Sequence, residues 1–243
     1  MRLFGLIGYP LTHSFSKKYF TQKFEKLGIA DTSYENFSIA NIQDLKSIIS
    51  GNPSLEGLNV TIPYKESVIN YLHEMTDVVR KIKACNCIKI VNGRLKGFNT
   101  DVMGFEKTLL SKLKPQHKNA LILGTGGAAK AVDFVLGKLG IKFKYVSRKP
   151  SVNNYSYEQL TKEVISAHPL IINTTPLGMY PNTIQAPPIP YEALTADHFL
   201  YDLIYNPEKT LFLEKGQQHG AVILNGYEML LLQAEESWNI WNN

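Results

Sequence analysis

The stretch LILGTGGAAKA, residues 121–131, decides the fold of this chain. Its apolar start predicts a buried strand, and the segment GGAAKAVDFVLGKLG that follows predicts a helix. Gly124, Gly126 and Ala129 have the GxGxx(G/A) spacing of loops that hold a dinucleotide pyrophosphate against a helix N-terminus. Glycines also serve ordinary turns. It is the strand before the loop and the helix after it that favour a dinucleotide site.

Strand and helix patterns alternate on both sides of this loop. Downstream, KFKYVS, PLIINTT, FLYDLIY and AVILNG predict strands, with helices at SYEQLTKEVIS and TLFLEKGQQHG and a long helix from about residue 227. Upstream, RLFGLIG, SYENFSI and LEGLNVTIP predict strands, and CIKIVNGRLKGF predicts a hairpin with an Asn-Gly turn. Helices are expected near residues 16–27, where Phe20, Phe24 and Leu27 share a face, near 45–49, and near 66–75. The alternation predicts an α/β fold with parallel sheets.

The pattern restarts between residues 101 and 118, which predicts two α/β domains. The Rossmann-like cofactor domain is expected at residues 102–225.

Composition excludes several classes of protein. The chain has 243 residues, 44% of them hydrophobic, without an apolar run of 18 residues, so we expect a globular protein and no membrane partner. The N-terminus lacks a signal-peptide pattern, and there are two cysteines, Cys85 and Cys87, which together predict a reducing cytoplasm. The net charge of +5 is not gathered into a Lys/Arg block, so no nucleic-acid partner is expected. The six histidines show no metal-ligand spacing, and no metal is expected.

The residues after the strand FKYVS indicate which dinucleotide binds. Ser147, Arg148 and Lys149 offer two cations where an NAD site usually offers an acid to the ribose. By themselves they could be a solvated basic turn. Together with the glycine loop they favour NADP(H), whose 2′-phosphate a guanidinium can bind.

A second polar group follows the strand in NVTIPYKE, residues 59–66. Asn59 and Thr61 share one face of this strand, and Lys65 comes just after Pro63 ends the pairing. A lysine here could be a solvated surface residue, and Asp101, after another strand, could be a helix cap. A carbonyl reduction, however, needs a proton donor, and a lysine oriented by an aspartate can serve.

With these motifs in place, the chain resembles shikimate dehydrogenases over nearly its whole length. The resemblance rests on GYPLTHSFS, NVTIPYK, ACNCI, GFNTD, GTGGAAKA, INTTPLGM, YDLIYNPEKT and NGYEMLLLQAEESW, in the order of the family. It implies an N-terminal substrate domain at residues 1–101, completed by a C-terminal helix in 226–243. It also implies a catalytic pair, Lys65 and Asp101. The substrate contacts that it implies are Ser14, Ser16, Asn59, Thr61, Asn86, Asp101, Tyr205 and Gln233.

The resemblance also implies a set of cofactor contacts, which are Asp77, Gly124, Thr125, Gly126, Gly127, Ala128, Ser147, Arg148, Lys149, Asn173, Thr174, Leu203 and Gly226. The chain departs modestly from the family pattern. Cys87 and Lys149 each stand where the family has a threonine.

The activity implied is the reversible NADPH-dependent reduction of 3-dehydroshikimate to shikimate, in the biosynthesis of chorismate and aromatic amino acids, by a monomer or homodimer. One alternative is an NAD-preferring quinate/shikimate dehydrogenase, which would want an acid near residues 147–149. Another is a ligand sensor that has kept the fold without catalysis, which would be expected to lose Lys65 or Asp101.

Overall fold

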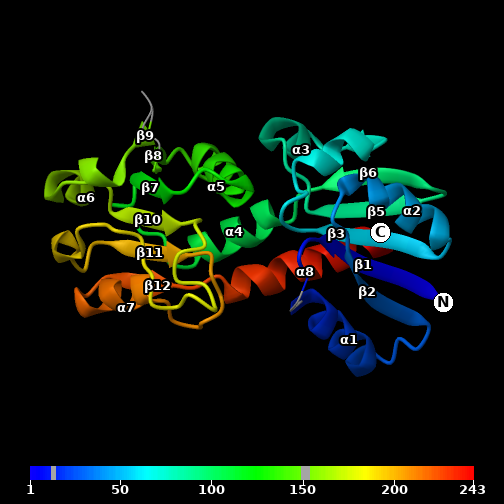
Figure 1. Cartoon of the computed structure of the whole chain (residues 1–243). Helices are drawn as coiled ribbons and strands as arrows, with labels where there is room; N and C mark the ends of the chain where they lie inside the picture. The colour runs from blue at the N-terminus through cyan, green and yellow to red at the C-terminus, as the bar shows by residue number, and fades with distance from the viewer. Residues whose placement is uncertain (12–14, 149–153) are drawn as a thin grey trace. The chain divides into compact units, whose positions relative to one another are not determined.

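The computed structural model describes residues 1–11, 15–148 and 154–243, which form two compact units. Unit 1 combines Met1–Thr100 with Ala234–Asn243, and unit 2 is Asp101–Gln233. Both units are α/β, as the alternating pattern predicts (Figure 1). The chain crosses between them after Thr100 and after Gln233, whereas the sequence pattern suggested crossings after 101 and near 226. The assignment of one unit to substrate and the other to cofactor stays a prediction.

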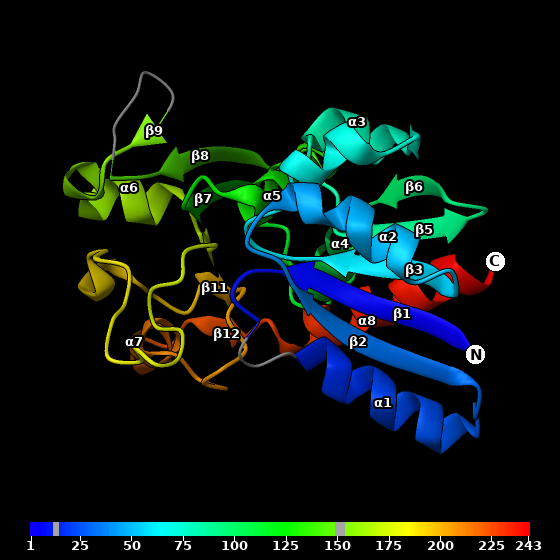
Figure 2. The ribbon, with the colours of Figure 1, turned by 45° about the vertical axis from the view of Figure 1, so that its right-hand side comes forward.

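Unit 1 is built around a mixed sheet (Figure 2). Its described strands are β1 (Arg2–Gly8), β2 (Thr32–Ser38), β3 (Leu55–Val60), β4 (Glu74–Met75), β5 (Cys87–Val91) and β6 (Arg94–Phe98), in the order β2-β1-β3-β5-β6-β4. β1 is parallel to β2 and β3, whereas β5 is antiparallel to β3 and β6. A parallel sheet was therefore the wrong prediction for this unit, because the predicted β5–β6 hairpin reverses the chain at Asn92 and Gly93, which both have positive φ.

Helices cover both faces of this sheet. They are α1 (Phe15–Leu27), η1 (Ile42–Asp44), α2 (Leu45–Gly51), η2 (Ser67–Tyr71), α3 (Asp77–Ile82) and the last turns of α8 (Tyr227–Asn242). Alternation along β1 supplies both cores: Ile7 packs in the cluster that contains Leu45 of α2, and Phe4 packs in the cluster that contains Phe24 of α1. Leu27 was expected on the buried face of α1 but is 57% exposed, because the helix ends there.

Trp241 of α8 completes the α1 side of unit 1. Its ring stacks on Phe4 with 4.7 Å between centroids, and it lies 5.4 Å from Phe20. Its indole N–H donates to the Ile88 carbonyl of β5 at 3.0 Å. Residues more than 200 positions apart in the sequence therefore share one aromatic core.

Unit 2 is built around a parallel sheet, as predicted. Its described strands are β7 (Asn119–Leu123), β8 (Lys142–Val146), β9 (Asn154–Tyr155), β10 (Leu170–Asn173), β11 (Phe199–Asp202) and β12 (Val222–Leu224), in the order β12-β11-β10-β7-β8-β9. Every pairing in this sheet is parallel. The chain runs one way from β7 to β9 and then resumes on the other side of β7 with β10. The switch point of the topology thus lies between β7 and β10, where ligands of such sheets bind.

The helices of unit 2 also cover both faces of its sheet. They are α4 (Asp101–Leu110), α5 (Gly127–Lys138), η3 (Tyr157–Gln159), α6 (Lys162–Ala167), η4 (Tyr191–Ala193), α7 (Leu211–Gln218) and the first turns of α8. On one face, Tyr201 of β11 stacks on Phe105 of α4 at 5.2 Å. On the other, Leu200 packs in the cluster that contains Phe212 of α7 and Ile165 of α6.

Two predicted helices take a different form. Residues 66–75 contain only the 3₁₀ turn η2, because His73 N–H bonds to the Leu95 carbonyl and the next residues join the sheet as β4. The predicted helix at 156–166 divides into η3 and α6, because Thr161 accepts from Val164 N–H and starts a new helix. In the described residues, none of the helices has the length and apolar character needed to cross a membrane.

Candidate active site

In unit 1, the polar residues of NVTIPYK lie at the end of β3. Thr61 N–H donates to the Ile7 carbonyl at 2.9 Å, and its own carbonyl accepts from Tyr64 N–H at 2.9 Å, which turns the chain at Pro63. The Lys65 carbonyl then accepts from Cys85 N–H at 2.7 Å. This backbone bond holds Lys65, whose side chain is partly exposed, beside the ACNCI stretch.

Asn86 is held by Thr100. The Thr100 N–H donates to Asn86 Oδ1 at 2.7 Å, and Asn86 Nδ2 lies 3.0 Å from Thr100 Oγ1. The Asn86 backbone bridges two strands, since its carbonyl accepts from Val60 N–H and its N–H donates to the Phe98 carbonyl. Asn86 is therefore fixed at the same end of the sheet as Thr61 and Lys65.

Asn59 is buried in unit 1, with 5% of its surface exposed. Its Oδ1 accepts from the Tyr34 hydroxyl at 2.8 Å, and its Nδ2 donates to Ser237 Oγ at 2.8 Å. The Ser16 side chain hydrogen-bonds to the same Tyr34 hydroxyl, and burial raises the pKa of Tyr34 well above its usual value. Three predicted substrate residues, Ser16, Asn59 and Asn86, are thus brought close to one another within unit 1.

The predicted catalytic pair is divided between the units. Lys65 belongs to unit 1, and Asp101 is the first residue of unit 2 and of α4. Asp101 is 8% exposed and directly follows Thr100, which Asn86 anchors. Their pairing stays a prediction.

Other predicted residues are placed as follows. Gln233, half-buried on α8, donates from Nε2 to the Leu230 carbonyl at 3.0 Å. Asp77 is exposed in the first turn of α3, and its Oδ1 lies 3.8 Å from Arg80 Nε. Ser14 and Lys149 lie outside the described residues.

The glycine loop of unit 2 follows β7, as predicted. Gly124 has φ of +104°, and a Cβ there would lie 2.8 Å from Thr174 Oγ1, so only glycine suits this turn. Gly126 caps α5, whose first residues, Gly127 and Ala128, are partly exposed. No described atom lies within 4 Å of a Cβ added at Gly126 or Gly127, which leaves the α5 N-terminus open to a phosphate.

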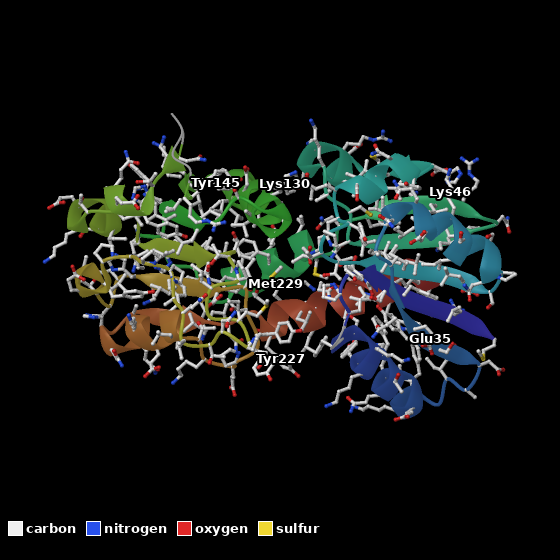
Figure 3. All side chains as sticks on the ribbon, viewed as in Figure 1. Glu35, Lys46, Lys130, Tyr145, Tyr227 and Met229 are labelled. Carbon is white, nitrogen blue, oxygen red and sulfur yellow. The ribbon has the colours of Figure 1, made fainter. Side chains whose placement is uncertain are left out.

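The end of β8 carries no acid in its described residues. Ser147 N–H donates to the Tyr155 carbonyl at 3.0 Å, and Arg148 follows, exposed. The Arg148 charge lowers the pKa of Tyr157, although burial raises it more. Tyr145, labelled in Figure 3, donates to Asp133 of α5 at 2.8 Å and so ties the glycine-loop helix to β8. An exposed guanidinium after β8 and an open helix N-terminus after the neighbouring strand β7 fit NADP(H).

Asp202 joins the loops that follow β10 and β11. This fully buried carboxylate accepts from Asn173 Nδ2 at 3.0 Å, from Ile204 N–H at 3.0 Å and from Thr210 Oγ1 at 2.5 Å. Asn173 Oδ1 in turn accepts from Thr175 N–H and Oγ1. Burial raises the pKa of Asp202 to about 6, and the three hydrogen bonds oppose that increase.

Gly226 and Leu203 lie against each other. A Cβ added at Gly226 would overlap the Leu203 carbonyl oxygen, and Gly226 N–H donates to the Ile204 carbonyl at 3.0 Å. Any side chain at Gly226 would therefore displace the segment after β11. Tyr205, in the same segment, is 37% exposed, and its partial burial raises its pKa.

The sequence reasoning missed the residues that hold the predicted contacts in place. Tyr34, Thr100, Ser237, Asp202 and Thr210 are all buried and polar, and each hydrogen-bonds to a predicted site residue or its support. Thr100 and Asp202 fall inside the motifs GFNTD and YDLIYNPEKT, which is a signal that could have found them. Tyr34 and Ser237 lie in patterns typical of ordinary strands and helices.

Two features lie apart from the predicted residues. A groove of about 740 Å³ in unit 1 is lined by α2, η2 and the β5–β6 hairpin, and no predicted site residue is among its lining. In the described part of the chain, no three His, Cys, Asp or Glu side chains are grouped so as to hold a metal ion.

Comparison with known proteins identifies the family. The model for the shikimate dehydrogenase substrate binding domain matches residues 6–88. Shikimate dehydrogenase (NADP(+)) of Methanococcus maripaludis strain C7 is 38% identical over an alignment of 259 positions. The alignment covers 99% of this chain and 91% of that protein.

Solved structures agree. A chorismate mutase/shikimate 5-dehydrogenase fusion protein from Clostridium acetobutylicum has a TM-score of 0.89 at 36% identity, over 100% of this chain and 91% of that one. Shikimate 5-dehydrogenase from Thermus thermophilus, in complex with NADP(H) and shikimate, has a TM-score of 0.87 at 29% identity, over 99% and 93% of the two chains. The resemblance seen in the motifs is confirmed, and this chain belongs to the shikimate dehydrogenase family.

Proposed function

We propose that this chain catalyses the reversible, NADPH-dependent reduction of 3-dehydroshikimate to shikimate. The observation that carries the proposal is the arrangement of Thr61, Lys65 and Asn86 at one end of the unit 1 sheet, held by backbone hydrogen bonds. Curated relatives that match nearly the whole chain are shikimate dehydrogenases that use NADP(+). As a biosynthetic enzyme it would serve the formation of chorismate and aromatic amino acids.

The substrate is a carboxylate that carries hydroxyl groups, and the proposed contacts match this chemistry. Ser14 and Ser16 hold the carboxylate. Asn59, Thr61, Asn86, Asp101 and Gln233 bind the ring hydroxyls, because amides and hydroxyls both donate and accept. Tyr205 is a further substrate contact.

Lys65 is the proposed acid and base. In the direction of reduction, its ammonium gives a proton to the carbonyl oxygen as that oxygen gains negative charge. In the direction of oxidation, the neutral amine takes the proton back from the hydroxyl. Asp101 orients the ammonium by charge attraction.

NADP(H), when bound, supplies the hydride acceptor or donor. The residues of unit 2 hold it: the glycine loop and the α5 N-terminus bind the pyrophosphate, and Ser147, Arg148 and Lys149 bind the 2′-phosphate. The segments at Asn173–Thr174, Leu203 and Gly226 line the nicotinamide side, and Asp77 is the remaining proposed contact.

The test is the loss of NADPH absorbance with 3-dehydroshikimate, repeated with NADH. Lys65→Ala should lower turnover by roughly 10²–10⁴, the usual contribution of general acid–base catalysis, while shikimate binding measured by calorimetry weakens much less. Lys46→Ala, at an exposed lysine on α2 (Figure 3), is the matched control and should behave as wild type.

The alternatives predict different results. Equal or better use of NADH would favour the NAD-preferring enzyme, and shikimate binding without turnover would favour the sensor. Near-normal turnover in Lys65→Ala would show that Lys65 is not the proton donor.

We also propose a cytoplasmic location, because Cys85 and Cys87 are free thiols in the structure. The working form is proposed to be a monomer or homodimer.

A further inference from the structure

Five buried polar side chains form a continuous run of hydrogen bonds through unit 1. They are Tyr34, Asn59, Ser237, Thr100 and Asn86, and each is at most 5% exposed. They come from β2, β3, α8 and the segments that flank β5 and β6. The run therefore joins elements that are far apart in the sequence.

The donors and acceptors of this run follow one direction. The Tyr34 hydroxyl donates to Asn59 Oδ1, so the Tyr34 oxygen accepts from Ser16. Asn59 Nδ2 donates to Ser237 Oγ at 2.8 Å, and Ser237 Oγ lies 3.4 Å from Thr100 Oγ1. Each hydroxyl can then accept one hydrogen bond and donate another, and hydrogen bonds in such a chain polarise and strengthen one another.

The two ends of the run are Thr100–Asn86 and Ser16. Thr100 bonds to Asn86 through both its N–H and its hydroxyl. Ser16 and Asn86 are the proposed contacts for the carboxylate and for a ring hydroxyl. Asn59 lies between them, and both ends of its amide are engaged inside the unit.

We propose that Tyr34, Ser237 and Thr100 are positioning residues that, through Asn59, hold Ser16 and Asn86 at a fixed separation for the substrate. The proposal rests on the proposed function and refines it.

The surroundings show why the run is more than packing. Tyr34, near one end of the run, belongs to the core cluster that contains Phe4, Phe20 and Trp241, and the other four side chains are also buried. A polar group in an apolar core costs free energy unless it is hydrogen-bonded, and apolar residues could fill the same space without that cost. What the hydrogen bonds add is a fixed orientation of the side chains that they join.

The test uses two single substitutions and a matched control. Tyr34→Phe and Ser237→Ala each remove one hydroxyl of the run, and neither removes a proposed substrate contact. Tyr64→Phe is the control, because Tyr64 is also buried in unit 1 and donates its hydroxyl to a carbonyl, that of Ile39 at 2.6 Å, outside the run.

We expect Tyr34→Phe and Ser237→Ala each to raise the KM for shikimate about three- to tenfold, the factor set by one lost hydrogen bond. The KM for NADP should stay within about twofold, because the glycine loop belongs to unit 2. Tyr64→Phe should leave both constants unchanged even where it lowers the melting temperature. A KM for shikimate that responds equally to Tyr34→Phe and Tyr64→Phe would overturn the proposal.

The double variant tests whether the Tyr34 and Ser237 hydroxyls act as parts of one run or independently of each other. If the run acts as a unit, Tyr34→Phe/Ser237→Ala raises the KM for shikimate by less than the product of the single effects. An effect equal to the product would overturn the single run. A folding-independent check is the NMR signal of the Asn86 side-chain amide, which should shift in Tyr34→Phe and not in Tyr64→Phe. Wild type that turns over no shikimate would refute the proposed function itself, whereas active wild type with unaffected variants refutes only the positioning role.

Discussion

Replacing Asp202 by asparagine should change how the stability of this protein depends on pH. The carboxylate is fully buried in unit 2 and accepts from Asn173, Ile204 and Thr210. Burial raises its pKa from 3.8 to about 6, despite those hydrogen bonds. An asparagine keeps an acceptor for Asn173 and Ile204 and carries no charge.

The sign of the effect follows from the raised pKa. Between pH 3.8 and about 6, the folded state holds this proton more tightly than the unfolded state does, so the free energy of unfolding falls as pH rises. The contribution of Asp202 is fully present below pH 3.8 and is lost above about pH 6. A shift of roughly two pKa units corresponds to about 3 kcal/mol in total, of which roughly half falls between pH 5 and 7.

The assay is urea unfolding of wild type and Asp202→Asn at several pH values between 4.5 and 7.5. Comparison of the two proteins cancels the other carboxylates. The difference in unfolding free energy should move in favour of Asp202→Asn as pH rises and level off above about pH 6. Asp31→Asn, at an exposed aspartate of unit 1, leaves this carboxylate in place and should keep the wild-type profile.

A difference between wild type and Asp202→Asn that stays constant over this range would refute the reasoning. It would mean that the Asp202 hydrogen bonds compensate the cost of burial in full. A difference that moved the other way, with wild type gaining stability as pH rises, would mean that the pKa is lowered.

Three further substitutions test the proposed contacts. Gln233→Ala should raise the KM for shikimate more than that for NADP, because its amide can bind hydroxyls; equal effects in steady-state kinetics would indicate a folding defect. Wild type should prefer NADPH to NADH by roughly ten- to hundredfold in kcat/KM, and Arg148→Ala should lose most of that preference. Added salt should weaken the preference of wild type for NADPH. An Arg148→Ala variant with an unchanged ratio of the two kcat/KM values would count against a phosphate-binding role for Arg148. Gly226→Ala should weaken NADP binding in a fluorescence titration and lower the melting temperature, since its Cβ would overlap the Leu203 oxygen; normal affinity and stability would show that the segment yields without cost.

Local patterns predicted the local structure well. The Asn-Gly pair at 92–93 gave the hairpin turn, and the glycine loop at 124–126 gave the strand, turn and helix of unit 2. These features depend on a few adjacent residues with restricted backbone angles, so they can be predicted from the local sequence.

Features that depend on distant partners were missed or wrong. The helix predicted at 66–75 is interrupted because strand β6 takes its last residues into the sheet, which periodicity within the segment does not reveal. The substrate contact of Asn59 stays a prediction, but the sequence did not reveal that its amide also bonds to Tyr34 and to Ser237, which is 178 residues away. A motif states which residue is needed, and only the fold states which partners hold it in place.

Unit 1 is assembled from both ends of the chain, and this has a consequence for its synthesis. Residues 234–243 supply Trp241, whose indole bonds to β5, and Ser237, which bonds to Asn59. During translation, residues 1–100 leave the ribosome long before these partners exist, whereas unit 2 is complete when Gln233 emerges. We therefore expect unit 1 to complete its fold only after unit 2 has been synthesised, and the nascent first hundred residues to expose an unfilled aromatic core until the final helix arrives.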